Sequence, residues 1–213
     1  MGTRTVSALL VLLATAYSDG VRLDRPLPVD RSVPSLQYDD GSAYWLTWVG
    51  LYKGVWFDVT NFDPEGGTGM ITDLEYWFYH HSSYPWDTAS FYGELYSGDE
   101  AGPVTEINQT SITALHYAPC YASYLPWGIC VEENFWGIIN SEMSSGGWPS
   151  ILGDNTPQYV SHSFQSDDFA TWDPWIVGSG STARDYFIRA NGAFGGIGLD
   201  EGTWGSIKGL FGR

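Results

Sequence analysis

The sequence predicts an all-β protein, an antiparallel β-sandwich or jelly roll that ends in a short C-terminal amphipathic tail. Short segments alternate apolar and polar side chains, as where Leu74, Tyr76 and Phe78 alternate with Glu75 and Trp77. Turn sequences rich in Gly, Pro, Asp and Ser separate these segments, and no stretch of the body sustains a helical period. Many short strands joined by tight turns are typical of sandwiches and jelly rolls.

The strands are expected at regular intervals through the body of the chain. We place them at residues 44–49, 55–60, 73–79, 91–96, 104–107, 112–117, 135–139, 159–164 and 186–190. The alternation assigns one face of each strand to the interior. The predicted core contains Leu74, Phe78, Phe91, Leu95, Ile138 and Ile188.

The composition fits one globular domain and excludes nucleic acid as a partner. The 213 residues are 43% hydrophobic and 16% aromatic, which is enough to build a core. The formal net charge is −16, from 25 acidic and 9 basic side chains. A chain this acidic lacks the basic surface that binding to phosphates requires.

The N-terminus has the pattern of a secretory signal peptide at residues 1–16. Arg4 precedes the apolar run Val6 to Leu13, and Ala14-Thr15-Ala16 provides a small-residue cleavage site. The apolar run is too short for a transmembrane span, and no later apolar segment is long enough to cross a bilayer. We therefore expect a protein that is secreted to the extracellular space or the cell surface.

Three regions follow the signal peptide. Residues 17–35 contain Pro26, Pro28 and Pro34 and read as an extended leader. Residues 36–191 form the predicted β-sandwich domain, and residues 192–213 form a Gly-rich hinge and an amphipathic tail.

The tail is expected to dock through one apolar face. Trp204, Ile207 and Leu210 lie three residues apart, and Phe211 lies seven beyond Trp204, which is the spacing of a short amphipathic helix. Gly205 weakens such a helix, so it needs a surface to pack on. A frayed terminus is the alternative.

The chain has two cysteines, Cys120 and Cys130, and we expect a disulfide between them. Export would place them where disulfides persist. The spacing differs from the C-x-x-C pattern of redox sites. Two unpaired buried thiols are the alternative.

Several short motifs resemble a known group of proteins. Asp39-Asp40-Gly41, Ile71-Thr72-Asp73-Leu74, Phe135-Trp136-Gly137-Ile138 and Asp185-Tyr186-Phe187-Ile188-Arg189-Ala190 occur in this order, and Thr203 to Lys208 follow near the end. The pattern resembles secreted β-sandwich modules of uncharacterised extracellular proteins from uncultured bacteria, which carry a short C-terminal extension. The resemblance implies a non-catalytic extracellular module and carries over no catalytic residue.

Aromatic residues are the most unusual feature, with 11 Trp and 14 Tyr. Strand alternation turns Trp56, Trp77, Tyr79, Tyr92 and Tyr96 away from the core face. Exposed flat rings stack on the apolar faces of sugars, so these residues are candidate contacts for a polysaccharide. They can equally contact other copies of this chain or cover a second sheet.

Acidic turns are candidate calcium ligands, and no other cofactor is expected. Asp39, Asp40, Asp63 and Glu65 lie beside Gly or Pro in predicted turns, and calcium prefers such oxygen ligands. They do not follow the known calcium-loop spacing, and solvated acidic turns are the alternative.

The alternative function is glycoside hydrolysis by a jelly-roll enzyme that resembles xylanases. Leu74-Glu75-Tyr76-Trp77 resembles the nucleophile strand of those enzymes, and the segment that begins at Glu142 resembles their acid/base strand. The hypothesis requires Glu75 and Glu142 to face each other across a cleft.

Overall fold

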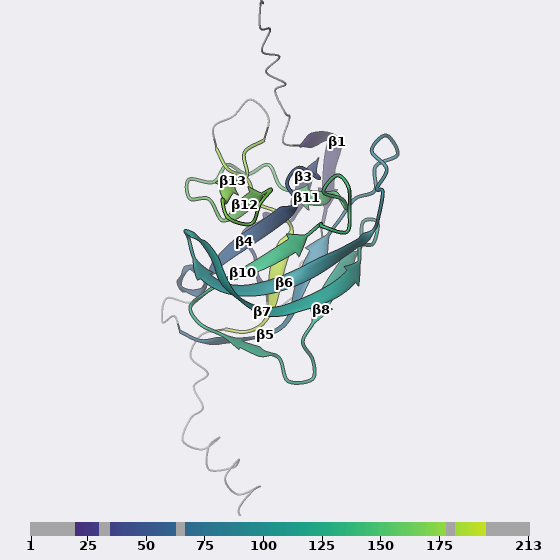
Figure 1. The fold of residues 1–213 in the computed structure, drawn as a ribbon. Coiled ribbons are helices and arrows are strands. Elements are labelled where there is room, and N and C mark those ends of the chain that lie inside the picture. Colours follow the sequence, from purple (N-terminus) through teal and green to yellow (C-terminus); the bar gives the residue numbers. More distant parts are fainter. Residues whose placement is uncertain (1–19, 30–34, 63–66, 178–181, 195–213) are drawn as a thin grey trace, which may run out of the picture.

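The computed structural model describes residues 20–29, 35–62, 67–177 and 182–194. These residues form antiparallel β-sheets, and the only helical element in the described ranges is a 3-10 turn, η1, at Val59–Asn61. The all-β prediction and the packed antiparallel sheets of a sandwich are confirmed (Figure 1). The predicted signal peptide, Asp63, Glu65 and the tail residues Trp204, Ile207, Leu210 and Phe211 lie outside the described residues.

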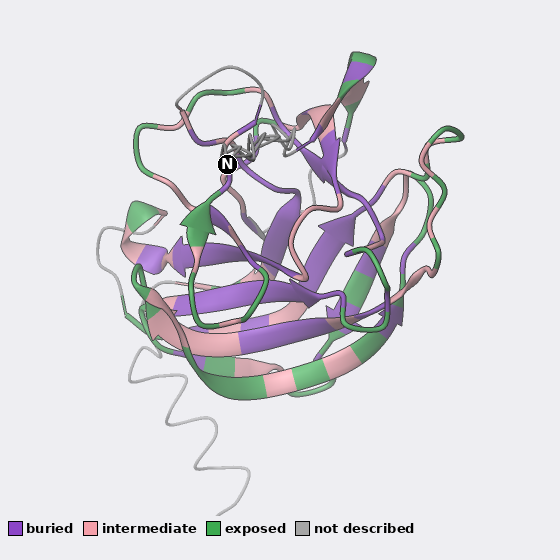
Figure 2. Cartoon of the chain, turned by 45° about the horizontal axis from the view of Figure 1, so that its top comes forward, coloured by how far each residue is buried: buried purple, intermediate pink, exposed green. Residues whose placement is uncertain are grey.

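The larger sheet has six strands in the order β13-β12-β4-β10-β6-β7. Their bounds are β4 Tyr52–Asp58, β6 Ser90–Asp99, β7 Gly102–Thr113, β10 Asn134–Asn140, β12 Ser163–Ser166 and β13 Asp173–Pro174. Trp136 of β10 lies opposite both Trp56 of β4 and Tyr96 of β6, which fixes the register at the centre of the sheet. Strand β7 is one edge, and Figure 2 shows exposed and intermediate positions along it beside the buried central strands.

The opposing sheet follows the order β2-β14-β5-β8, and β9 pairs with the beginning of β5. Its strands are β2 Ser35–Leu36, β5 Gly69–Trp77, β8 Pro119–Ser123, β9 Ile129–Val131 and β14 Ile188–Ala193. Strand β14 continues to Ala193, so the folded region extends two residues beyond the predicted domain end at residue 191.

A third sheet joins β1 (Val21–Pro28), β3 (Ser42–Thr47) and β11 (Ile151–Gly153). The prediction that residues 17–35 form an extended leader is wrong for β1, because Val21–Pro28 pairs with β3 and buries Leu23. The prolines are tolerated because β1 is an edge strand whose pairing shifts register between Arg22 and Leu27.

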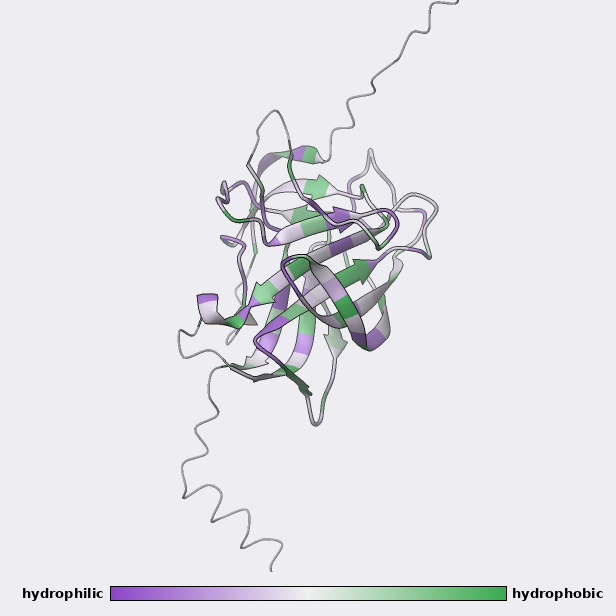
Figure 3. Cartoon of the chain, turned by 60° about the vertical axis from the view of Figure 1, so that its left-hand side comes forward, coloured by the Kyte–Doolittle hydropathy of each residue, from purple (hydrophilic) through white to green (hydrophobic). Residues whose placement is uncertain are grey.

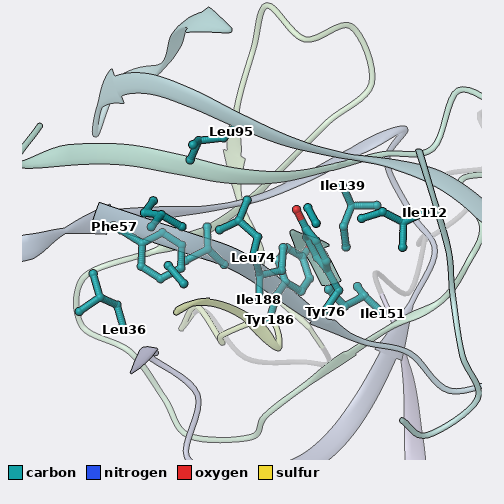
Figure 4. Close-up of a cluster of buried hydrophobic side chains, with 14 of the residues drawn as sticks. Leu36, Phe57, Leu74, Tyr76, Leu95, Ile112, Ile139, Ile151, Tyr186 and Ile188 are labelled. Carbon is teal, nitrogen blue, oxygen red and sulfur yellow. The ribbon is translucent and has the colours of Figure 1, made fainter. Parts of the chain in front are cut away.

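The main core lies between the two larger sheets. Leu74, Phe78, Phe91, Leu95 and Ile188 are all buried there, as predicted. Figure 4 shows side chains of this cluster converging from both sheets, among them Phe57, Leu74, Leu95 and Ile188. Burying this much apolar area is the main favourable contribution to folding.

Two further apolar clusters lie on faces that the alternation assigned to solvent. Trp77 packs with Leu23, Leu46, Leu152 and Phe187 in a cluster that includes the three-stranded sheet. Trp56 packs with Trp136, Ile138, Tyr52 and Phe164 on the outer side of the six-stranded sheet.

These clusters correct three predictions. Trp56 and Trp77 were expected to be exposed, yet only 8% and 7% of their surfaces are accessible. Ile138 is buried, but in the outer cluster with Trp56 and not between the two large sheets. Figure 3 shows apolar and polar positions alternating along strands, as the sequence requires. The alternation was therefore read correctly, but further side chains cover the second face.

Candidate functional site

Of the five predicted aromatic contacts, the structure brings Tyr92 and Tyr96 together on one face. Both are half-buried and lie on the outer side of β6, opposite the core residues Phe91 and Leu95. Tyr79 lies elsewhere, with its ring 4.7 Å from the ring of His116. Trp56 and Trp77 are buried, as described above.

The neighbouring edge strand β7 completes this surface. Its register places Ser111 opposite Tyr92, Gln109 opposite Glu94, and Glu106 opposite Tyr96. Paired residues in a sheet share a face, so all six side chains lie on one side. Ser111, Gln109 and Glu106 are exposed. We call Tyr92, Glu94, Tyr96, Glu106, Gln109 and Ser111 the β6 face.

Glu94 is a buried acid at the centre of the β6 face, with 1% of its surface accessible. The Gln109 side-chain amide donates to its Oε1 at 2.7 Å, and that of Asn140 donates to the same oxygen at 2.8 Å. The other oxygen, Oε2, is buried without a partner. Burial raises the pKa of Glu94, and the nearby carboxylates of Glu106 and Glu142 raise it further. Because both amides donate to Oε1, a bound proton belongs on Oε2.

Two tyrosine hydroxyls hold the surrounding carboxylates. The Tyr96 hydroxyl donates to Oε2 of Glu106 at 3.2 Å, and the Tyr52 hydroxyl donates to Oε1 of Glu142. The ring of Phe169 lies 5.0 Å from that of Tyr52 and 5.1 Å from that of Tyr96. The loop that carries Phe169 therefore packs over this end of the β6 face.

The predicted pairing of Glu75 with Glu142 is wrong. Glu75 lies on β5, 1% exposed, where it accepts from Arg189 Nη1 at 3.2 Å and from Trp77 Nε1 at 2.6 Å. Glu142 is exposed and follows β10 of the other sheet. Their side chains belong to opposite outer sides of the sandwich, so they cannot flank one substrate bond.

Glu94 was not among the predicted site residues, although Tyr92 and Tyr96, its neighbours on the same face, were. The alternation that turned Tyr92 and Tyr96 outward also turns Glu94 outward. The sequence alone therefore indicated that an acidic residue lies between the two outward-facing tyrosines on this face. Its burial was not visible, because Asn140 and Tyr52 approach it only through tertiary pairing.

The structure assigns other roles to the calcium candidates that it describes. Both oxygens of the Asp39 carboxylate accept from Arg189, at 2.7 and 2.9 Å. Asp40 accepts from the Ser42 backbone N–H at 2.7 Å and from the Thr156 hydroxyl at 2.6 Å. No group of three or more His, Cys, Asp or Glu within the described ranges is arranged to hold a metal ion.

The predicted disulfide is also wrong. Cys120 lies opposite Tyr76 and Cys130 lies opposite Met70 on the same strand, β5. Six residues of strand separate these positions by about 20 Å, far beyond the Cα separation of about 7 Å that a disulfide tolerates. Both thiols are free, with Cys120 buried and Cys130 exposed.

A hollow of about 250 Å³ lies beside the loop that follows β12. Its lining includes Gln165, Asp167, Asp168 and Asp173. It contains none of the predicted site residues. Its acidic character disfavours anionic ligands.

Comparison of the chain with protein-family models, with curated proteins and with solved structures gives no match. Within the described residues, no helix is both long enough and apolar enough to cross a membrane.

Proposed function

We propose that the protein is a non-catalytic extracellular module that binds a polysaccharide across the β6 face. The observation that carries the proposal is the placement of Tyr92 and Tyr96 on one face with an exposed polar row beside them. Four residues of strand separate the two tyrosines by about 13 Å, which suits contacts with successive sugar units of a chain. Tyrosine rings offer the apolar surface that sugar C–H faces contact.

The polar row supplies groups for sugar hydroxyls. Gln109 has both a donor and an acceptor, Ser111 has a hydroxyl, and Glu106 accepts hydrogen bonds. The hydrogen bonds from Gln109 to Glu94 and from Tyr96 to Glu106 fix these side chains before a ligand arrives. Groups already held in place lose less entropy on binding.

The net negative charge of the protein favours neutral polysaccharides over polyanionic ones. A net charge of −16 repels polyanions, so neutral polysaccharides are the expected ligands. Binding of anionic sugars would also require basic residues that pair with their negative charges. The β6 face contains none.

Binding of neutral polysaccharides by the purified chain tests this proposal. Replacing Tyr92 or Tyr96 by Ala should weaken binding about tenfold or more, because each removes a stacking ring. The matched control is Tyr159→Ala, since Tyr159 is fully exposed and lies outside the β6 face. Equal affinity in all three variants would contradict the proposal.

Self-assembly through the same surface is the competing use of flat aromatic area. Size-exclusion chromatography separates the two uses. A monomer that binds glycan supports the module proposed above. Large assemblies that disappear in the Tyr96→Ala variant, without any glycan binding, would identify a structural role instead.

A second candidate function is glycoside hydrolysis, with Glu94 in place of Glu75. A protonated Glu94 Oε2 has the character of a general acid, and Glu142 supplies an exposed carboxylate nearby. This candidate ranks second because only 1% of the Glu94 surface is accessible, so a substrate could reach the carboxyl group only if the surrounding side chains moved.

Release of reducing ends from neutral polysaccharides tests this second candidate. Hydrolysis that Glu94→Gln abolishes, and that the exposed control Glu132→Gln preserves, would establish it. Binding without any release of reducing ends would reject it and leave the binding module in place.

A further inference from the structure

The edge of β5 that carries β8 and β9 has an exposed apolar surface away from the β6 face. Both strands run antiparallel to β5 along this edge, and residues 124–128 form the loop that joins them. Accessible fractions are 82% for Trp127, 65% for Leu125 and 45% for Tyr121. Large exposed apolar side chains within one short segment indicate a contact surface. We call Tyr121, Leu125, Trp127 and the neighbouring Cys130 the 121–130 surface.

The register places Tyr121 and Cys130 on the same side of the sheet. Tyr121 lies opposite Glu75, and Cys130 lies opposite Met70. The side chains of Ile71 and Leu74 on β5 point into the main core, so Glu75 and Met70 belong to the outer side. The exposed thiol of Cys130 therefore reports directly on this surface.

The described part of the chain ends beside this surface. Met70 pairs with Ala193 of β14 on one side and with Cys130 of β9 on the other. Two strand spacings place Ala193 about 10 Å from Cys130. Phe194, the last described residue, thus lies next to the 121–130 surface.

The sequence beyond Phe194 has the length and chemistry to cover the 121–130 surface. Nine residues, 195–203, precede Trp204 and reach up to about 30 Å when extended. The segment from Trp204 to Phe211 offers Trp204, Ile207, Leu210 and Phe211 as an apolar set. Lys208 and Arg213 provide positive charge, and the exposed Glu132 and Glu133 follow β9.

We infer that residues 203–211 dock on the 121–130 surface of their own chain. The occupant is this tail because its attachment point is adjacent, which gives it a high effective concentration there. The Gly residues at 205 and 209 make the segment dependent on such a surface for order. This inference does not depend on polysaccharide binding, which uses the other sheet.

Thiol labelling of Cys130 with a maleimide tests the inference. The chain from Tyr17 to Arg213 is compared with one that ends at Phe194, which retains every described strand. Docking predicts that Cys130 reacts about tenfold faster in the shortened chain, because the covering segment is gone. The buried Cys120 should stay unreactive in both chains, which shows that the fold is intact.

Substitutions on the 121–130 surface provide the matched comparison. Trp127→Ser in the full chain should also accelerate labelling, whereas the exposed control Tyr159→Ser should not. A peptide of residues 199–213 added to the shortened chain should slow labelling again, and its Trp204→Ser version should not.

Two results would overturn the inference. Equal labelling rates in the full and shortened chains would show that the tail does not cover the 121–130 surface. Protection that increases with protein concentration, together with a dimer in size-exclusion chromatography, would show that a second copy occupies it.

Discussion

Two carboxyl groups, those of Asp154 and Asp185, are completely buried where the three-stranded sheet meets the end of β5 and the start of β14. Asp154 Oδ1 accepts from the Asp185 backbone N–H at 3.1 Å, and Asp185 Oδ1 accepts from the Ser163 hydroxyl at 3.1 Å. The Oδ2 atom of each is buried without a partner. Burial raises the pKa of Asp154 to about 8 and that of Asp185 to about 7.

Replacing Asp154 by Asn, which imitates the protonated acid, should stabilise the protein increasingly as the pH rises. The native fold keeps a proton on Asp154 up to about pH 8, whereas the unfolded chain loses it near pH 3.9. Between these values Asp154 makes the native protein lose stability with rising pH, and the Asn variant lacks this contribution. Asp185, whose pKa is also raised, contributes in both proteins. Urea unfolding of both proteins at pH 5 and pH 8 measures the difference. His162 and Lys53 also titrate with shifted pKa values, but their contributions cancel between the two proteins. A stability difference that is equal at both pH values would contradict this assignment.

At the scale of elements, hydrophobic alternation predicted the central strands but not what covers them. β6 and β10 contain the segments expected at 91–96 and 135–139, and β4, β5 and β14 overlap the other three central segments. Alternation records which side chains share a face, and it carries no information on whether another layer packs there. For that reason Trp56 and Trp77 were placed on the correct faces and given the wrong exposure.

The elements that sequence analysis missed are short or contain proline. β9 and β11 have three residues each, too few to show a period. The strand expected at 104–107 lies within β7, and β7 continues to Thr113 because the polar segment after Ile107 still pairs with β6. It therefore includes only the first two residues of the strand expected at 112–117. The candidate site was predictable only in part, because Glu94 becomes buried through residues of β4 and β10.

Strand β11 makes a close contact that yields an element-scale prediction. The Trp175 ring lies against the backbone of Gly153, where a Cβ atom would come within 2.1 Å of the ring. Gly153→Ala should therefore lower the free energy of unfolding by about 1–3 kcal/mol through overpacking. Gly146→Ala is the control, since its nearest atom is 3.3 Å away, on the exposed side. Chemical denaturation compares them, and a Gly153→Ala variant as stable as the control would refute the tight packing.

At the scale of the whole molecule, a buried ion pair joins an early and a late part of the folded chain. Asp39 lies just before β3, and Arg189 lies in the last strand, β14. Arg189 also donates to Glu75 at 3.2 Å, so one guanidinium holds two acids. This contact gives a physical reason for the Asp39-Asp40-Gly41 and Ile188-Arg189-Ala190 motifs to occur in the same chain.

Breaking this ion pair should destabilise the entire sandwich. Arg189→Met leaves the carboxylates of Asp39 and Glu75 buried without their cation, and removing one partner of a buried pair costs about 3–5 kcal/mol. Asp39→Asn should also destabilise, because it removes the charge that pairs with Arg189. The double variant should lose less than the sum of the single losses, since the two changes remove the same interaction. Asp40→Asn is the matched control, because Asp40 is an exposed neighbour of Asp39 that accepts from the Ser42 backbone N–H and the Thr156 hydroxyl. Urea unfolding of the four variants gives the coupling energy between Asp39 and Arg189. Strictly additive losses would mean that this pair does not hold the early and late parts of the chain together.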